Sequence, residues 1–238
     1  MKQVIAMHGW GSDSNSWQIW ANQFRRNGWQ WQSTERGYGE LPSFRPYWEK
    51  ASKKDCYQQR VVIAHSLGLH LLNNEILSNA TDIVLMASFS RFIPNGIESR
   101  VLKAALKGMQ KRLGTTEETT MLNNFLQKAC RPEEIREIPP GPITKGLSFE
   151  GRKQLQADLE LLIRSHKLPR DLQTKSRVLI VQGTEDSIVL PSSRSALLED
   201  LKKHLDGDPT YWEINGAGHL LLDPGLINRV ENWLDAYR

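Results

Sequence analysis

One serine stands where a buried strand would turn sharply into a helix. In segment 61–68 (VVIAHSLG), four apolar residues precede His65 and Ser66, and an apolar helical pattern follows at once. The pattern is G-x-S-x-G with Ala64 in place of the first glycine, and such a turn exposes a serine hydroxyl at its apex. A turn of this kind is easier to build without a serine. Ser66 is therefore a candidate nucleophile, with a small turn residue as the alternative.

The elements around Ser66 alternate between short apolar runs and helical stretches. This alternation predicts a parallel sheet covered on both faces. A first helix is expected to start near Asp13 and stop at Gly28. The other predicted helices are 47–54, 66–77, 192–205 and 224–237, and the predicted strands are 3–7, 29–33, 61–64, 83–87, 177–182 and 211–214.

Four of the predicted strands are followed by loops with residues suited to chemistry. Functional groups gather at the carboxyl ends of the strands in an open parallel sheet. The loops are His8-Gly9-Trp10-Gly11, the turn at Ser66, Gly183-Thr184-Glu185-Asp186 and Gly216-Ala217-Gly218-His219. We therefore expect all four loops at one edge of the sheet.

These motifs together resemble the α/β-hydrolase family, in which a triad appears in the order Ser, Asp or Glu, His. The resemblance runs from Gln3 to the end of the chain, without the hairpin that usually precedes the first strand. It implies an α/β-hydrolase fold: a mostly parallel sheet with helices on both faces and a helical cap inserted after the family's sixth strand. Ser66 would be the nucleophile, Asp186 the acid and His219 the base.

The same resemblance implies roles for the neighbouring residues. The backbone N–H groups of Leu67 and Trp10 would form the oxyanion hole, and His8 would shape the loop that carries Trp10. Two alternatives stay open: Glu185 could replace Asp186, although the Gly-x-x-Asp spacing favours Asp186, and His219 could be a packed loop histidine. His65 would either line the pocket or simply pack.

Composition bounds the class of protein. The chain has 238 residues with 31 Lys/Arg and 27 Asp/Glu, and it contains no apolar run of the length needed to span a membrane. Met1–Met7 lacks the pattern of a signal peptide, and Cys56 and Cys130 follow no metal-ligand spacing. We expect a cytoplasmic protein with two reduced, structural thiols, no cofactor and no metal.

The middle of the chain differs from the rest. Residues 93–170 show helical stretches and no convincing strand, so we expect a helical cap there and a core made of 1–92 and 171–238. Between Arg91 and Arg170 there are 15 Lys/Arg and 9 Asp/Glu, so the excess of positive charge belongs to this segment.

Four cations share one predicted helical face: Arg100, Lys103, Lys107 and Lys111. The other face would carry mainly apolar residues, namely Val101, Leu102, Ala105, Leu106 and Met109. The cationic face is either simply solvated or a docking stripe for an acidic partner. Nucleic acid is the least favoured partner, because no motif that recognises bases is present.

A closer resemblance concerns the substrate. The segments 8–11 (HGWG), 66–67 (SL) and 125–129 (FLQKA) resemble those of the pimeloyl-acyl-carrier-protein methyl ester esterases of biotin synthesis. This resemblance implies an enzyme that acts on an ester bound to an acidic carrier protein, which the four cations would engage. We expect a monomer. The substrate would contact Trp10, Leu67, His219, Phe125, Leu126 and Ala129.

Two other functions remain as alternatives. One is a general short- or medium-chain carboxylesterase or thioesterase, because the same fold and triad serve all of these reactions. The other is a non-catalytic binding protein on a hydrolase scaffold. Such proteins usually lose a triad member, whereas this chain has Ser66, Asp186 and His219. The presence of all three favours an enzyme.

Overall fold

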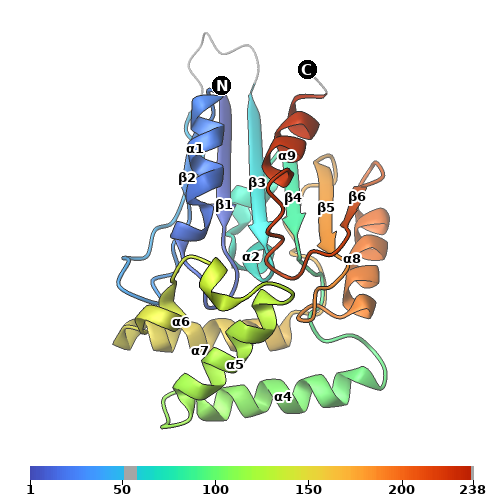
Figure 1. Ribbon diagram of the computed structural model, residues 1–238. Helices are drawn as coiled ribbons and strands as arrows, with labels where there is room; N and C mark the ends of the chain where they lie inside the picture. Colours follow the sequence, from blue (N-terminus) through green and yellow to red (C-terminus); the bar gives the residue numbers. More distant parts are fainter. Residues whose placement is uncertain (51–57, 237–238) are drawn as a thin grey trace.

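A six-stranded, fully parallel sheet forms the centre of the computed structural model, which describes residues 1–50 and 58–236 (Figure 1). The strand order is β2-β1-β3-β4-β5-β6. Each strand overlaps one predicted from the apolar runs, so the fold-class prediction is confirmed. The strands are β1 Lys2–Met7, β2 Gln30–Ser33, β3 Gln59–His65, β4 Asp82–Met86, β5 Arg177–Gly183 and β6 Thr210–Ile214.

The central strands are buried on both faces, as expected for a parallel sheet. Along β3, Val61 and Ile63 belong to one core cluster, whereas Val62 and Ala64 belong to another. Helices α1 (Gln18–Arg26) and α9 (Leu226–Asp235) pack on the first cluster. Three helices pack on the second, namely α2 Gly68–Leu71, α3 Asn74–Ser78 and α8 Pro191–His204.

A group of helices follows β4 and lies beyond the carboxyl edge of the sheet (Figure 1). A third cluster joins these helices to the core through Trp10, Leu67 and Phe89. The chain reaches this group after β4, its fourth strand. The elements are α4 Glu98–Arg112, α5 Glu118–Cys130, η2 Ile135–Glu137, α6 Pro142–Lys145 and α7 Phe149–Arg164.

A buried carboxylate connects this helical group to the core. Asp158 on α7 accepts hydrogen bonds from Arg36 Nε at 2.8 Å and from the Tyr38 hydroxyl at 2.6 Å. Burial and the negative charge of Asp158 hold the pKa of Tyr38 well above its usual value, so the phenol stays protonated and donates. Asp158 is 3% exposed, so its charge depends on these partners.

The prediction of a helix over 47–54 is wrong for residues 47–50, which form no helix. Side-chain amides take the backbone groups that a helix would use. Gln32 bonds to both the N–H and the C=O of Tyr47, and Gln3 does the same for Glu49. Residues 51–54 of that prediction, and Cys56, lie outside the described residues.

The helix predicted over 66–77 is divided into α2 and α3. Asn73 has an extended backbone, and its side chain accepts a hydrogen bond from the N–H of Ile76 at 2.9 Å. This is an N-cap, so a new helix starts there. Within residues 1–50 and 58–236, no helix is both long enough and apolar enough to cross a membrane.

Candidate active site

Ser66 lies at a strained turn at the end of β3. Its φ is +54°, a left-handed value that is uncommon for a residue other than glycine. The turn is attached to β4, since Ser66 N–H donates to Met86 C=O at 2.9 Å and Ser66 C=O accepts from the Ser88 hydroxyl at 2.8 Å. These two hydrogen bonds hold Ser66 in an unfavourable backbone conformation at the end of β3.

Small residues around this turn allow its close packing. A Cβ at Gly68 would lie 2.6 Å from the Met7 carbonyl oxygen, so this position needs glycine. Ala64 stands where the pattern has another glycine, yet it is fully buried inside β3, paired with Met7 and Leu85. The extra methyl group is thus accommodated in the sheet.

His219 and Asp186 meet at the carboxyl ends of β5 and β6. His219 Nδ1 lies 2.9 Å from Asp186 Oδ2, and both residues are buried. Asp186 Oδ1 also accepts from the N–H groups of Ile188 and Val189. Burial alone would raise the pKa of Asp186, but the charge of His219 and these hydrogen bonds lower it below its usual value. Glu185 is exposed, so the geometry selects Asp186 as the carboxylate partner.

Backbone hydrogen bonds hold the two loops together. Glu185 N–H donates to Ala217 C=O at 3.0 Å, and Thr184 N–H donates to Ile214 C=O at 3.1 Å. A Cβ at Gly183 would lie 2.2 Å from the Ala217 carbonyl oxygen, which explains why this loop opens with glycine. These bonds between the bases of the two loops bring Asp186 next to His219.

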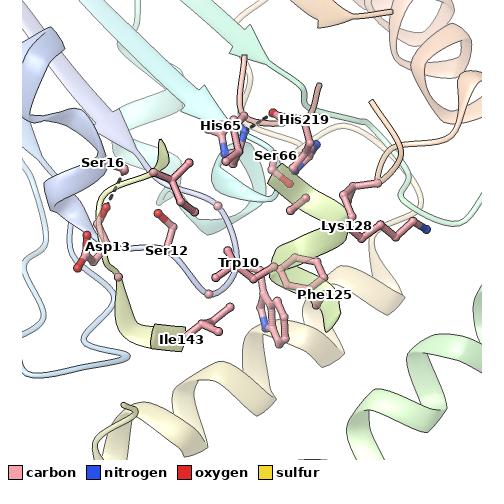
Figure 2. A pocket seen from close by; sticks show the side chains of 18 of the residues that line it. Trp10, Ser12, Asp13, Ser16, His65, Ser66, Phe125, Lys128, Ile143 and His219 are labelled. Atoms are coloured by element: carbon pink, nitrogen blue, oxygen red, sulfur yellow. Dashed lines mark hydrogen bonds between the residues drawn. The ribbon is translucent and has the colours of Figure 1, made fainter. Parts of the chain in front are cut away.

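Ser66 and His219 line the same cavity, and Figure 2 shows their side chains next to each other. Among the described residues, no hydrogen bond joins the Ser66 hydroxyl to His219. Hydrogen bonds between catalytic groups are often long in the absence of substrate and shorten in the complex. Because Asp186 holds Nδ1, Nε2 is the nitrogen of His219 that can serve Ser66.

The loop after β1 approaches the turn at Ser66 closely. A Cβ at Gly9 would lie 3.0 Å from Ser66 Cβ. Within the described chain, neither the N–H of Trp10 nor the N–H of Leu67 has a hydrogen-bond acceptor. Two unpaired N–H groups beside a serine are the donors that an oxyanion hole requires.

A cavity of about 1120 Å³ opens over Ser66, and its lining is mainly apolar. Trp10 and Phe125 contact each other edge to face in this lining, with ring centroids 5.0 Å apart (Figure 2). Leu126 and Ala129 also line the cavity. Leu67 does not, because its side chain is fully buried beneath. A contact between Leu67 and substrate stays a prediction, and it would have to be made by the backbone.

Sequence reasoning missed part of the lining. Trp17 and Trp20, which lie in the region of the first predicted helix, border the cavity as well. Leu222 and Ile227, which follow His219, do so too. Helical spacing identifies a buried face, but it does not distinguish packing against a sheet from packing around a cavity.

The outer face of α4 carries the four predicted cations. Arg100, Lys103, Lys107 and Lys111 are all exposed, and within the described chain none of them forms an ion pair. The predicted apolar face is only partly correct. Leu106 is buried, and Leu102 and Met109 pack beside it and line the cavity, but Val101 is 74% exposed and Ala105 is exposed as well.

His8 does not line the cavity. It is buried, and its Nδ1 donates to Gly9 C=O at 2.9 Å while Nε2 accepts from Arg36 N–H at 3.3 Å. Burial lowers the pKa of His8, so the ring is neutral and connects two loops. Cys130 is buried as well, and burial raises the pKa of its thiol. Among the described residues, no group of His, Cys, Asp and Glu side chains is arranged to hold a metal ion.

Comparisons with known proteins identify the fold. No family model and no curated protein sequence matches the chain. Solved structures do match, each over 99% of this chain. A bromoperoxidase from Bacillus anthracis is 16% identical with a TM-score of 0.66 over 90% of its length. A thermophilic esterase from Thermogutta terrifontis is 14% identical with a TM-score of 0.65 over 90% of its length. MenH from S. aureus is 13% identical with a TM-score of 0.58 over 94% of its length.

Proposed function

Starting from the α/β-hydrolase fold of this chain, we propose that it is a carboxylic ester hydrolase with Ser66 as nucleophile, His219 as base and Asp186 as acid. One observation carries the proposal: the buried 2.9 Å contact between His219 and Asp186 lies beside a serine at φ +54°. Buried carboxylate–imidazole pairs next to a strained serine are the arrangement used for nucleophilic acyl transfer.

The reaction follows from this arrangement. His219 Nε2 takes the proton of the Ser66 hydroxyl as the oxygen attacks the ester carbonyl, and Asp186 stabilises the imidazolium through Nδ1–H. His219 then protonates the departing alkoxide, which leaves an acyl ester on Ser66. Water, deprotonated by the same imidazole, attacks this ester; the acid is released and Ser66 regains its proton.

The oxyanion formed in both steps would be bound by the N–H groups of Leu67 and Trp10. Losing one such donor typically raises the barrier by about 2.7–4 kcal/mol. Both groups belong to backbone that packing immobilises, since Leu67 is fully buried and Trp10 Nε1 donates to Leu155 C=O at 2.8 Å. Donors that are already in place lose little energy to reorganisation during the reaction.

For the substrate, we propose the methyl ester of a pimeloyl chain carried by an acyl carrier protein, as in biotin synthesis. Residues 93–170 would act as a cap over Ser66, and the apolar cavity bordered by Phe125, Leu126 and Ala129 suits a methylene chain. The solved structures with this fold include an esterase and MenH. One fold serves several chemistries, so the fold by itself does not identify the substrate.

The cationic face of α4 supports a carrier-bound substrate. Arg100, Lys103, Lys107 and Lys111 are exposed and form no ion pair within the described chain. Exposed residues of α4 and α5, Ala105 and Lys128 among them, also line the cavity. The cavity therefore reaches the surface beside these cations, where an acidic carrier would dock. The proposal is of a cytoplasmic monomer that meets its carrier in solution.

The experiment that tests the reaction uses a covalent fluorophosphonate probe. Wild type and Ser195→Ala, which removes an exposed serine on α8, are expected to be labelled, and Ser66→Ala is not. If wild type stays unlabelled and hydrolyses no ester, the catalytic proposal is overturned in favour of a non-catalytic binding protein.

The substrate is tested separately with methyl-pimeloyl carrier protein and detection of the free acid. Rapid release of methanol from this ester, and slow release from methyl pimelate without carrier, is the expected result. Rapid turnover of simple short esters or thioesters, with none of the carrier-bound ester, would leave the esterase chemistry standing and reject the substrate.

A further inference from the structure

His65, the residue before the nucleophile, contacts the loop that carries His219. Its Nε2 lies 2.9 Å from the carbonyl oxygen of His219. A carbonyl oxygen only accepts hydrogen bonds, so Nε2 of His65 carries the proton and Nδ1 does not. The imidazole of His65 is thus a donor with a defined tautomer, bonded to the backbone of the base itself.

The same ring packs against two further groups. Its centroid lies 4.9 Å from that of the His219 ring, and a Cβ at Gly9 would lie 3.0 Å from its Nδ1. Gly9 directly precedes Trp10, whose N–H we assign to the oxyanion hole. His65 therefore contacts the nucleophile's turn, the base's loop and the oxyanion loop at once (Figure 2).

We propose that His65 is a positioning residue, whose neutral ring holds the His219 loop at the distance from Ser66 that proton transfer requires. This inference rests on the proposed esterase function. It assigns His65 no proton transfer of its own, because its Nε2–H is bonded to His219 C=O.

The His219 loop needs such a restraint. It contains Gly216 at φ +74° and Leu221 at φ +52°, and its sequence Gly216-Ala217-Gly218 is conformationally permissive. The bond from His65 holds the peptide unit of His219, so the ring orientation no longer depends on Asp186 alone. A displacement of about 1 Å in a catalytic group can cost about 100-fold in rate.

The ring of His65 must also stay uncharged for this role. The titratable groups that face it are His219, Asp186 and His8. Burial, then repulsion from His219, lowers the pKa of His65 to about 3, so the ring is neutral wherever the enzyme would work. A positive charge on His65 would repel, and so destabilise, the imidazolium that His219 forms in the reaction.

The test compares two substitutions at this position. His65→Phe keeps a ring of similar size and loses the donor, whereas His65→Gln keeps an N–H donor near the position of Nε2. We expect His65→Phe to lower kcat about 10- to 100-fold with KM nearly unchanged, because orientation is lost rather than binding. His65→Gln is expected to recover most of that loss.

A matched control separates positioning from general packing. His70 also bonds through Nε2 to a backbone carbonyl at 2.9 Å, that of Phe89, and it stacks on a ring, but it does not line the cavity. His70→Phe is expected to lower the melting temperature without changing kcat. Equal kcat losses in His65→Phe and His70→Phe would overturn the proposal.

Hydrogen exchange provides a readout that needs no substrate. Amides 215–222 are expected to exchange faster in His65→Phe than in wild type, His65→Gln or His70→Phe. Unchanged exchange in this loop, or full kcat in His65→Phe, rejects the positioning role even if the enzyme is active. Inactive wild-type protein rejects the proposed function instead, and the exchange measurement still decides whether His65 holds the loop.

Discussion

The loops at the carboxyl edge of the sheet and the outer face of α4 both carry the polar residues on which the proposed function depends, but they are organised differently. Ser66, Asp186 and His219 come from three loops far apart in the sequence, and they converge on one buried site. The cations of α4 come from a single helix, stay exposed and meet no partner among the described residues.

The difference shows how position determines the strength of an electrostatic group. A buried pair such as His219–Asp186 is screened little by water, so its geometry strongly affects its energy. An exposed charge such as that of Lys103 is screened by solvent and salt. It affects the rate of association with a charged partner more than it affects the stability of the fold. The same change of charge should therefore have very different effects in the two regions.

The largest effect is expected at the carboxyl edge. Asp186→Asn should lower kcat by about 10⁴-fold, because an amide no longer favours the Nδ1–H tautomer of His219 or stabilises its charged form. Glu185→Gln is the matched control, since it removes the exposed carboxylate beside Asp186. Steady-state kinetics on one ester checks both variants. Equal losses in the two variants would contradict the assignment of Asp186.

The second-largest effect is expected at the buried contact between α7 and the core, and it is an effect on stability. Asp158→Ala removes the acceptor of Arg36 and Tyr38. It should lower the free energy of unfolding by about 3 kcal/mol, near the lower end for breaking a buried ion pair, because the Arg36 side chain is 25% exposed. Urea unfolding measures this. Glu160→Ala, which affects a loose surface pair with Arg164, should change it by less than about 0.5 kcal/mol.

A smaller, pH-dependent effect is expected from the neutral buried imidazoles. The pKa of His65 is lowered to about 3 in the folded protein, below the usual 6.5. The unfolded chain therefore binds one more proton than the fold between these pH values, and stability falls as pH drops from about 6.5 toward 3. Urea unfolding at several pH values should show a shallower dependence in His65→Gln. His166→Gln, which changes an exposed histidine, should leave the dependence unaltered.

The smallest effect is expected on α4. The triple variant R100E/K103E/K107E should change the free energy of unfolding by only about 0.5 kcal/mol and leave turnover of small esters intact, because the charges are solvated. For the carrier-bound ester, kcat/KM should fall about 10-fold at low salt and less at high salt. The control K175E/K202E/K203E makes the same charge change elsewhere on the surface. A similar loss in the control would argue against a docking face.

The sequence by itself determined the strands, their alternation with helices, and the order of the candidate residues. Apolar runs such as Val61–Ala64 favour strands in the middle of a sheet, and strand direction then puts the following loops at one edge. The Gly-x-x-Asp spacing also favoured Asp186 over Glu185, and Gly183 lies where two backbones approach closely. These signals are local, so they can be found in a single amino-acid sequence.

Tertiary structure alone decided the rest. Residues 47–50 are not helical because Gln3 and Gln32, distant in the sequence, bond to their backbone. Val101 is exposed because the neighbouring helices cover only part of the apolar face of α4. His65 contacts His219 through a bond between residues 154 positions apart. Pairwise contacts of this kind depend on how elements pack, and no periodicity or local motif encodes them.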